Sequence, residues 1–104
     1  MAITVTGKLL NGIEIDGVLH QDFVMREATI RDAINAIDKR NAAGEGLTSY
    51  LTLQMYQAAE QLQSLGDLPK DKVNAELLFG LPEDDIAPLL DALEAVKKKP
   101  KPAS

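Results

Sequence analysis

The stretch FVMREATIRD, residues 23–32, marks the point where this chain changes from strand to helix. Before it, apolar and polar residues alternate, which is typical of half-buried strands. After it, Ile30, Ile34 and Ile37 recur at helical spacing, which predicts an amphipathic helix. Thr29 stands where that helix should begin, because its hydroxyl can accept hydrogen bonds from amides of the first turn. The junction therefore predicts an α+β fold.

The segment before the junction, residues 3–26, is expected to form a β-hairpin or three short strands. Asp16-Gly17 is the favoured turn, because both central residues of a type I′ turn must tolerate positive φ. Asn11-Gly12 offers the same chemistry, so it is expected to be a second turn or a bulge. A hairpin alone is marginally stable in water, so it must pack against helices.

About four helices are expected after the hairpin, as a bundle on which it packs. Apolar periodicity and cap residues define their limits. The predicted ranges are 30–41, 49–65, 71–79 and 85–98.

The 104 residues are expected to form one domain, residues 1–96, with a basic and disordered tail, residues 97–104. Four of the eleven basic side chains lie in that tail, which leaves seven basic and sixteen acidic side chains in residues 1–96. A body this acidic repels phosphate backbones, so no nucleic acid is expected as a partner.

Catalytic, cofactor and metal sites are not expected in this chain. It has no cysteine and one histidine, His20, and no phosphate-binding glycine motif or nucleophile elbow. No run of 18 apolar residues and no signal-peptide pattern occurs, so neither a membrane span nor a leader is expected. These observations favour a binding protein over an enzyme.

The densest carboxylate cluster is Glu83, Asp84 and Asp85. Adjacent residues on a helix point apart, which disfavours an acid–base pair. Asp84 or Asp85 is instead expected to cap the helix at 85–98, where acidic residues also compensate the helix dipole.

The junction carries five polar residues, Arg26, Glu27, Thr29, Arg31 and Asp32. The preferred interpretation is structural: a helix cap with a salt bridge between an arginine and a neighbouring acid. A solvated pair of that kind contributes only about 0–1 kcal/mol. The alternative interpretation is a polar contact point for a partner.

A broad apolar surface on the helix at 49–65 is the best candidate for partner binding. Tyr50, Leu53 and Tyr56 lie beside its main stripe and widen it, and tyrosine is enriched at protein interfaces. Core and interface remain equally plausible for these three side chains. Surplus apolar helix surface suits helix-in-groove binding.

The junction FVMREATIRD resembles the "L-R-E-P-T-v-R-D" signature of Mu-like phage tail assembly chaperones, the phage tail protein E family. A hairpin with an Asp-Gly turn precedes it, and the segment 81–93 is similar to the family's Asp-containing last helix. The likeness covers about residues 8–96. The chain departs from the pattern at Ala28, where the family usually has proline.

The resemblance implies a protein of the bacterial host cytoplasm, encoded by a phage or prophage, that binds the tape measure protein. Such chaperones keep its apolar helices soluble until the tail tube polymerises and are absent from the virion. The alternative is a structural minor tail component retained in the particle. Further partners implied are the tail tube protein and a longer form of the chain made by frameshifting near the lysine run. The oligomeric state stays open.

Overall fold

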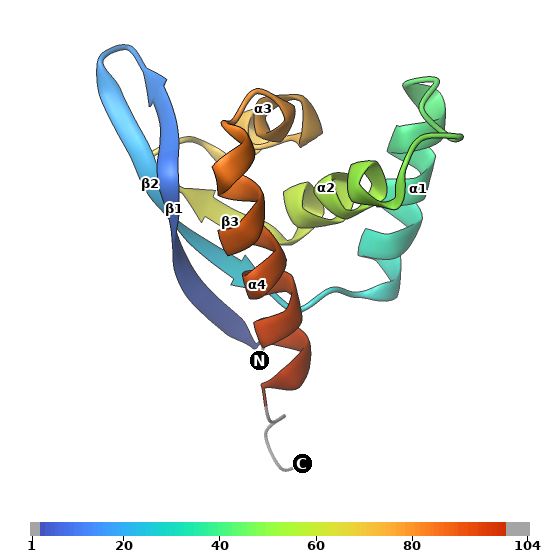
Figure 1. The fold of residues 1–104 in the computed structure, drawn as a ribbon. Helices are drawn as coiled ribbons and strands as arrows, with labels where there is room; N and C mark the ends of the chain where they lie inside the picture. Colours follow the sequence, from blue (N-terminus) through green and yellow to red (C-terminus); the bar gives the residue numbers. More distant parts are fainter. Residues whose placement is uncertain (1–2, 100–104) are drawn as a thin grey trace.

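A three-stranded antiparallel sheet and four α-helices form the described part of the chain, which confirms the predicted α+β class (Figure 1). The computed structural model describes residues 3–99. The strands are β1 (Thr4–Ile15), β2 (Val18–Arg26) and β3 (Leu62–Leu65). The α-helices are α1 (Ile30–Ala42), α2 (Tyr50–Gln61), α3 (Ala75–Phe79) and α4 (Ile86–Lys98). Two short 3-10 helices precede the last two helices, η1 (Lys70–Lys72) and η2 (Glu83–Asp85).

The amino-terminal segment is one long hairpin of two strands, not three short ones. Its turn is Asp16-Gly17, with φ of 53° and 78°, as the positive-φ chemistry of the pair predicted. Asn11-Gly12 is a bulge, because the register of β1 against β2 shifts between Lys8 and Ile13.

The third strand comes from the end of the predicted helix 49–65, so that prediction is wrong after Gln61. Leu62–Leu65 pairs with the free edge of β2, where Phe23 lies opposite Leu65. Leu62 and Leu65 are 0% and 1% exposed, so they fill core positions from a strand. A register shift opposite Met25 lets two residues three positions apart both face the core.

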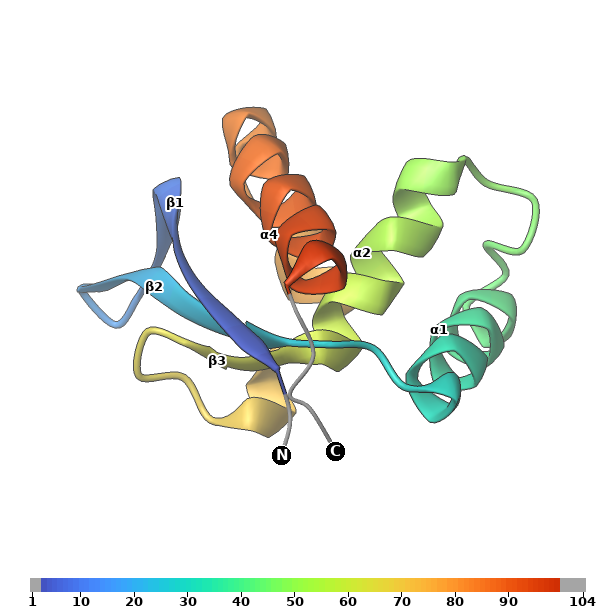
Figure 2. The same cartoon turned by 90° about the horizontal axis from the view of Figure 1, so that it is seen from below.

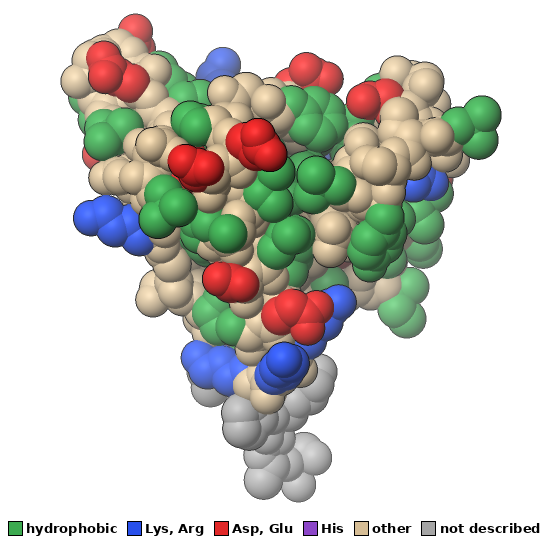
Figure 3. Space-filling model, in the orientation of Figure 1, with side chains coloured by type: hydrophobic (Ala, Val, Ile, Leu, Met, Phe, Trp, Pro, Cys, Tyr) green, Lys and Arg blue, Asp and Glu red, His purple; other side chains and the backbone are tan. Residues whose placement is uncertain are grey.

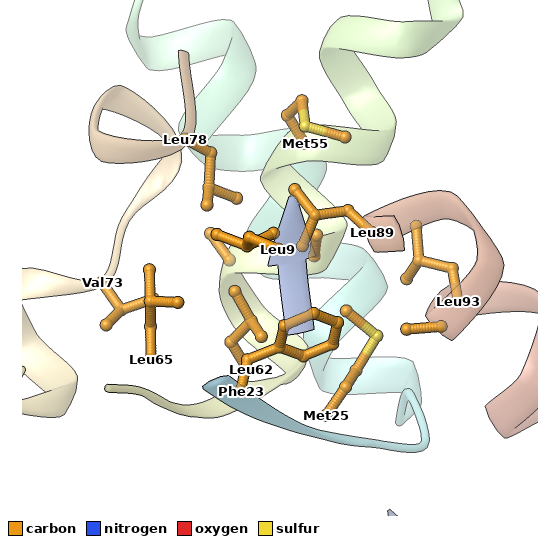
Figure 4. Close-up of a cluster of buried hydrophobic side chains, with 13 residues drawn as sticks. Leu9, Phe23, Met25, Met55, Leu62, Leu65, Val73, Leu78, Leu89 and Leu93 are labelled. Carbon is orange, nitrogen blue, oxygen red and sulfur yellow. The ribbon is translucent and has the colours of Figure 1, made fainter. Parts of the chain in front are cut away.

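The main core lies where α4 crosses one face of the sheet, with α2 beside it (Figure 2). Figure 4 shows Leu9, from the bulge of β1, surrounded by side chains of α2, α3 and α4. Most of the core is aliphatic, and Phe23 is the one aromatic ring in its main cluster. Each large side chain buried there contributes roughly 1.5–3 kcal/mol.

Helix α1 turns its apolar face outward. The amphipathic pattern of a core helix would place that face inward. Most of the tertiary contacts of α1 are with α2, on the far side of that helix from the sheet (Figure 2). Asp32 and Ala36 face inward and are buried, whereas Ile30 is 82% exposed and Ile34 and Ile37 are exposed as well. The physical reason is the ion pair that Asp32 makes with Arg26, which fixes this face of α1 inward.

The last two predicted helices are confirmed with changed limits. The range 71–79 divides into η1 and α3, and the range 85–98 begins with η2. The predicted disordered tail starts too early, because Lys97 and Lys98 belong to α4. The Lys99 ammonium donates a hydrogen bond to the Thr4 carbonyl at 2.7 Å. The rest of that tail lies outside the described residues.

Candidate functional site

An open apolar groove of about 310 Å³ lies between α2, α3 and the start of α4. Figure 3 shows apolar side chains gathered on this face among acidic ones. Leu51 on one wall is 37% exposed and Phe79 on another is 39% exposed, so the groove offers apolar surface to solvent. Its lining also includes Met55, Leu81, Glu83 and Ile86.

The floor of the groove is fixed to the sheet through Asp85, which is fully buried. Its two carboxylate oxygens accept hydrogen bonds from the amides of Asn11 and Gly12, each at 2.9 Å. Asp85 therefore fastens the beginning of α4 to the bulge in β1. Asp85 occupies the N-cap position of α4, as predicted, but its side chain makes no cap bond to α4, and Asp84 is an exposed residue of η2.

The predicted contact residue Tyr56 is a core residue, only 6% exposed. Its hydroxyl donates to the Glu45 carboxylate at 2.6 Å, and its ring meets Phe79 edge to face at 5.7 Å between centroids. The hydrogen bond to Glu45, together with burial, raises the pKa of Tyr56 to about 12. Tyr56 thus supports a groove wall from behind and offers a partner little surface.

The other two predicted contact residues lie in different surroundings. Tyr50 is 65% exposed and lines a smaller hollow of about 100 Å³ between α1, α2 and α4. Leu53 is half-buried and packs against the second core cluster, which contains Ala36, Tyr56 and Ala75. The three predicted side chains therefore do not form one common surface.

Three polar residues of the junction hold α1 in place. The Arg26 guanidinium forms a two-pronged ion pair with Asp32, with Nη2 to Oδ1 at 2.8 Å, and also donates to the Glu60 carbonyl at 2.9 Å. Thr29 is the N-cap of α1, as predicted, and forms a capping box with Asp32. The Arg26 hydrogen bond lowers the pKa of Asp32 from 3.8 to about 2.

The other two predicted junction residues are Glu27 and Arg31. The Glu27 amide donates to the Ile3 carbonyl at 2.9 Å, which extends the strand pairing. Arg31 is exposed on α1. The structural interpretation of the junction therefore rests on Arg26, Thr29 and Asp32.

The groove could not be predicted from the sequence, because the residues that line it come from three separate predicted helices. Leu51 reads as part of the main stripe of its helix, and Phe79 as the end of the next. The available signal was Leu81, an apolar residue in the short link between helices, which lies in the groove wall.

Among residues 3–99, no group of three or more acidic or histidine side chains is placed to hold a metal ion. Within the same range, no helix is both long and apolar enough to cross a bilayer.

Comparison of the chain with known protein families, with curated proteins and with solved structures found no significant match.

Proposed function

We propose that this chain is a phage tail assembly chaperone that binds apolar helical segments of the tape measure protein in the groove. It would act in the cytoplasm of the bacterial host, before the tail tube polymerises. The observation that carries the proposal is the open apolar groove in which Leu51 and Phe79 remain exposed. The resemblance of FVMREATIRD to the tail protein E signature points to the same role.

The shape and lining of the groove suit one face of an amphipathic helix. Apolar side chains at positions i, i+3 and i+4 of such a helix enter a groove from one side. Each square ångström of apolar surface that they bury contributes about 25 cal/mol. A groove of about 310 Å³ admits few side chains, so each contact is weak and reversible, as a chaperone that must release its client requires.

Co-expression with the tape measure protein of the same phage tests this function. The tape measure protein should be soluble with the chain, should co-purify with it, and should aggregate without it. Leu51→Glu places a charge in the groove and should reduce the co-purified amount about tenfold or more. Leu19→Glu is the matched control, because Leu19 is 53% exposed on β2 and does not line the groove.

Two results would overturn the proposal. One is a tape measure protein that is equally soluble without the chain, and the other is an equal loss of binding for the two variants. Mass spectrometry of purified virions separates a chaperone from the alternative, a minor tail component. A chaperone should be missing from the particle, whereas a tail component should be present in fixed proportion to the tail tube protein.

A further inference from the structure

The outer face of α1 is an uncovered apolar stripe. Ile30, Ile34 and Ile37 are 82%, 40% and 42% exposed, and they occupy the face of α1 opposite to the buried Asp32 and Ala36. Figure 2 shows α1 at one end of the fold, next to α2 and away from the sheet. Figure 3 shows apolar side chains along the edge of the molecule where α1 lies. The stripe is separate from the groove, which α1 does not line.

Opposite charges flank one side of this stripe. Arg31 and Asp38 are seven residues apart, so they lie two turns from each other on the same flank. Both are exposed, and within the described part of the chain neither side chain makes a hydrogen bond or ion pair. The other flank carries Ala33 and Arg40. The stripe is therefore bordered by two opposite charges, and no side chain of α1 forms an ion pair with either of them.

We propose that the α1 stripe binds the α1 stripe of a second copy of this chain, with the two helices antiparallel about a two-fold axis. A two-fold axis of this kind places each flank of the stripe against the same flank of the other copy. Pairing Ile34 with Ile37 of the second copy then brings Arg31 opposite Asp38 of that copy. Because of the two-fold symmetry, this ion pair forms twice in the dimer.

The charges select this arrangement over a parallel one. In a parallel pair, opposite flanks meet, and Asp38 would face Ala33 of the second copy, without any ion pair. The antiparallel pair also places Ile30 beside Asn41, which continues the same exposed face. Charge complementarity thus identifies the occupant as a second copy in one orientation.

The expected dimer is weak and reversible. Helix α1 has 13 residues and is therefore about 20 Å long. A single helix pair of this length buries less than the roughly 1,200–2,000 Å² of standard stable interfaces. We therefore expect association in the range of about 10 μM to 1 mM.

Sedimentation equilibrium of the full chain across that range tests the inference. The average mass of the wild type should rise from one chain toward two, and Ile34→Glu should lower the association constant about tenfold or more. Arg31→Asp and Asp38→Arg should each stay single-chain, because each places like charges opposite one another twice. Both substitutions favour the α1 dipole, so a loss of folding is not expected, and circular dichroism checks this.

The decisive experiments are two that restore opposite charges across the interface. An equimolar mixture of the Arg31→Asp and Asp38→Arg variants should form a heterodimer, because every facing pair is then opposite in sign. The double variant in one chain should self-associate like the wild type. The inference is overturned if the wild type stays single-chain up to about 1 mM. It is also overturned if the charge-reversed variants dimerise with the same association constant as the wild type. Leu51→Glu should leave self-association unchanged, so this result is independent of groove binding.

Discussion

The Asp85 carboxylate accepts a hydrogen bond from the Gly12 amide across a separation of 73 residues, with 2.9 Å between Oδ2 and the nitrogen. The Asn11 amide binds the other oxygen in the same way. Gly12 is required at this point, because its φ is +77° and an added Cβ would lie 2.4 Å from the His20 carbonyl oxygen. The bulge and the acid therefore form one unit that joins the hairpin to α4.

Substitution Asp85→Asn should destabilise the fold by about 2 kcal/mol, because the Asn11 and Gly12 amides bind different carboxylate oxygens and the NH₂ group that replaces one of them would face a donor. Asp84→Asn is the matched control, since Asp84 is exposed and should change stability by less than about 0.5 kcal/mol. Urea unfolding of the two variants measures the difference. If the two variants lose the same free energy of unfolding, the buried hydrogen bonds of Asp85 contribute nothing to stability beyond the effect of its charge.

The ion pair between Arg26 and Asp32 predicts a dependence of stability on pH. Because the folded pKa of Asp32 is lowered from 3.8 to about 2, its contribution is complete above pH 3.8 and is lost as pH falls through about 2. With allowance for the solvent that reaches Arg26, this contribution is about 1–2 kcal/mol. The stability gap between wild type and Asp32→Asn, measured by urea unfolding, should close over that range.

Asp38→Asn removes an exposed carboxylate from the same helix and provides the control for this series. At neutral pH it should change stability by less than about 0.5 kcal/mol. A gap between wild type and Asp32→Asn that persists down to pH 2 would contradict the assigned role of the ion pair.

The two tyrosines should respond differently to loss of the hydroxyl. Tyr56→Phe removes the hydrogen bond to Glu45 and should cost about 1 kcal/mol of unfolding free energy. Tyr50→Phe should have no measurable effect on stability, because Tyr50 is 65% exposed. Thermal unfolding of both variants checks this. Similar melting temperatures would show that the hydrogen bond to Glu45 contributes nothing to stability.

The loop after β3 should not tolerate a side chain at Gly66. Its φ is +57°, and an added Cβ would lie 2.3 Å from Nδ1 of His20, which accepts a hydrogen bond from the Asp67 amide. Gly66→Ala should therefore cost about 3 kcal/mol, the sum of backbone strain and a displaced histidine. Gly17→Ala is the control with the same sign of φ and free space around it, and should cost only about 1 kcal/mol. Denaturant midpoints for the two variants would coincide if the His20 contact were unimportant.

Local signals in the sequence were sufficient to predict most of the elements. The Asp16-Gly17 turn and the Thr29 cap depend on residues next to each other, so their chemistry can be recognised from sequence. The strand β3 could not be predicted in this way. Leucines spaced for a helix also fit a bulged strand, and only the free edge of β2 decides between the two.

The orientation of α1 and the groove depended on contacts that apolar periodicity does not show. Periodicity shows that α1 has an apolar face, but the ion pair of Asp32 with Arg26, and the hydrogen bond from Arg26 to the Glu60 carbonyl 34 residues away, decide which face turns inward. The groove depends equally on long-range contacts, because Asp85 reaches Asn11 across 74 residues. For the same reason Tyr56, adjacent to the exposed part of α2 in sequence, lies in the core.

Helix α1 is attached mainly to α2, which has a consequence for the dynamics of the fold. Segments with few buried apolar contacts open independently of global unfolding, with a smaller free energy. The buried side of α1 consists of Asp32 and Ala36, so little apolar surface opposes its separation from α2. Amide protons of α1 are therefore expected to exchange with solvent before those of β2, and a partner that covers the stripe should slow that exchange.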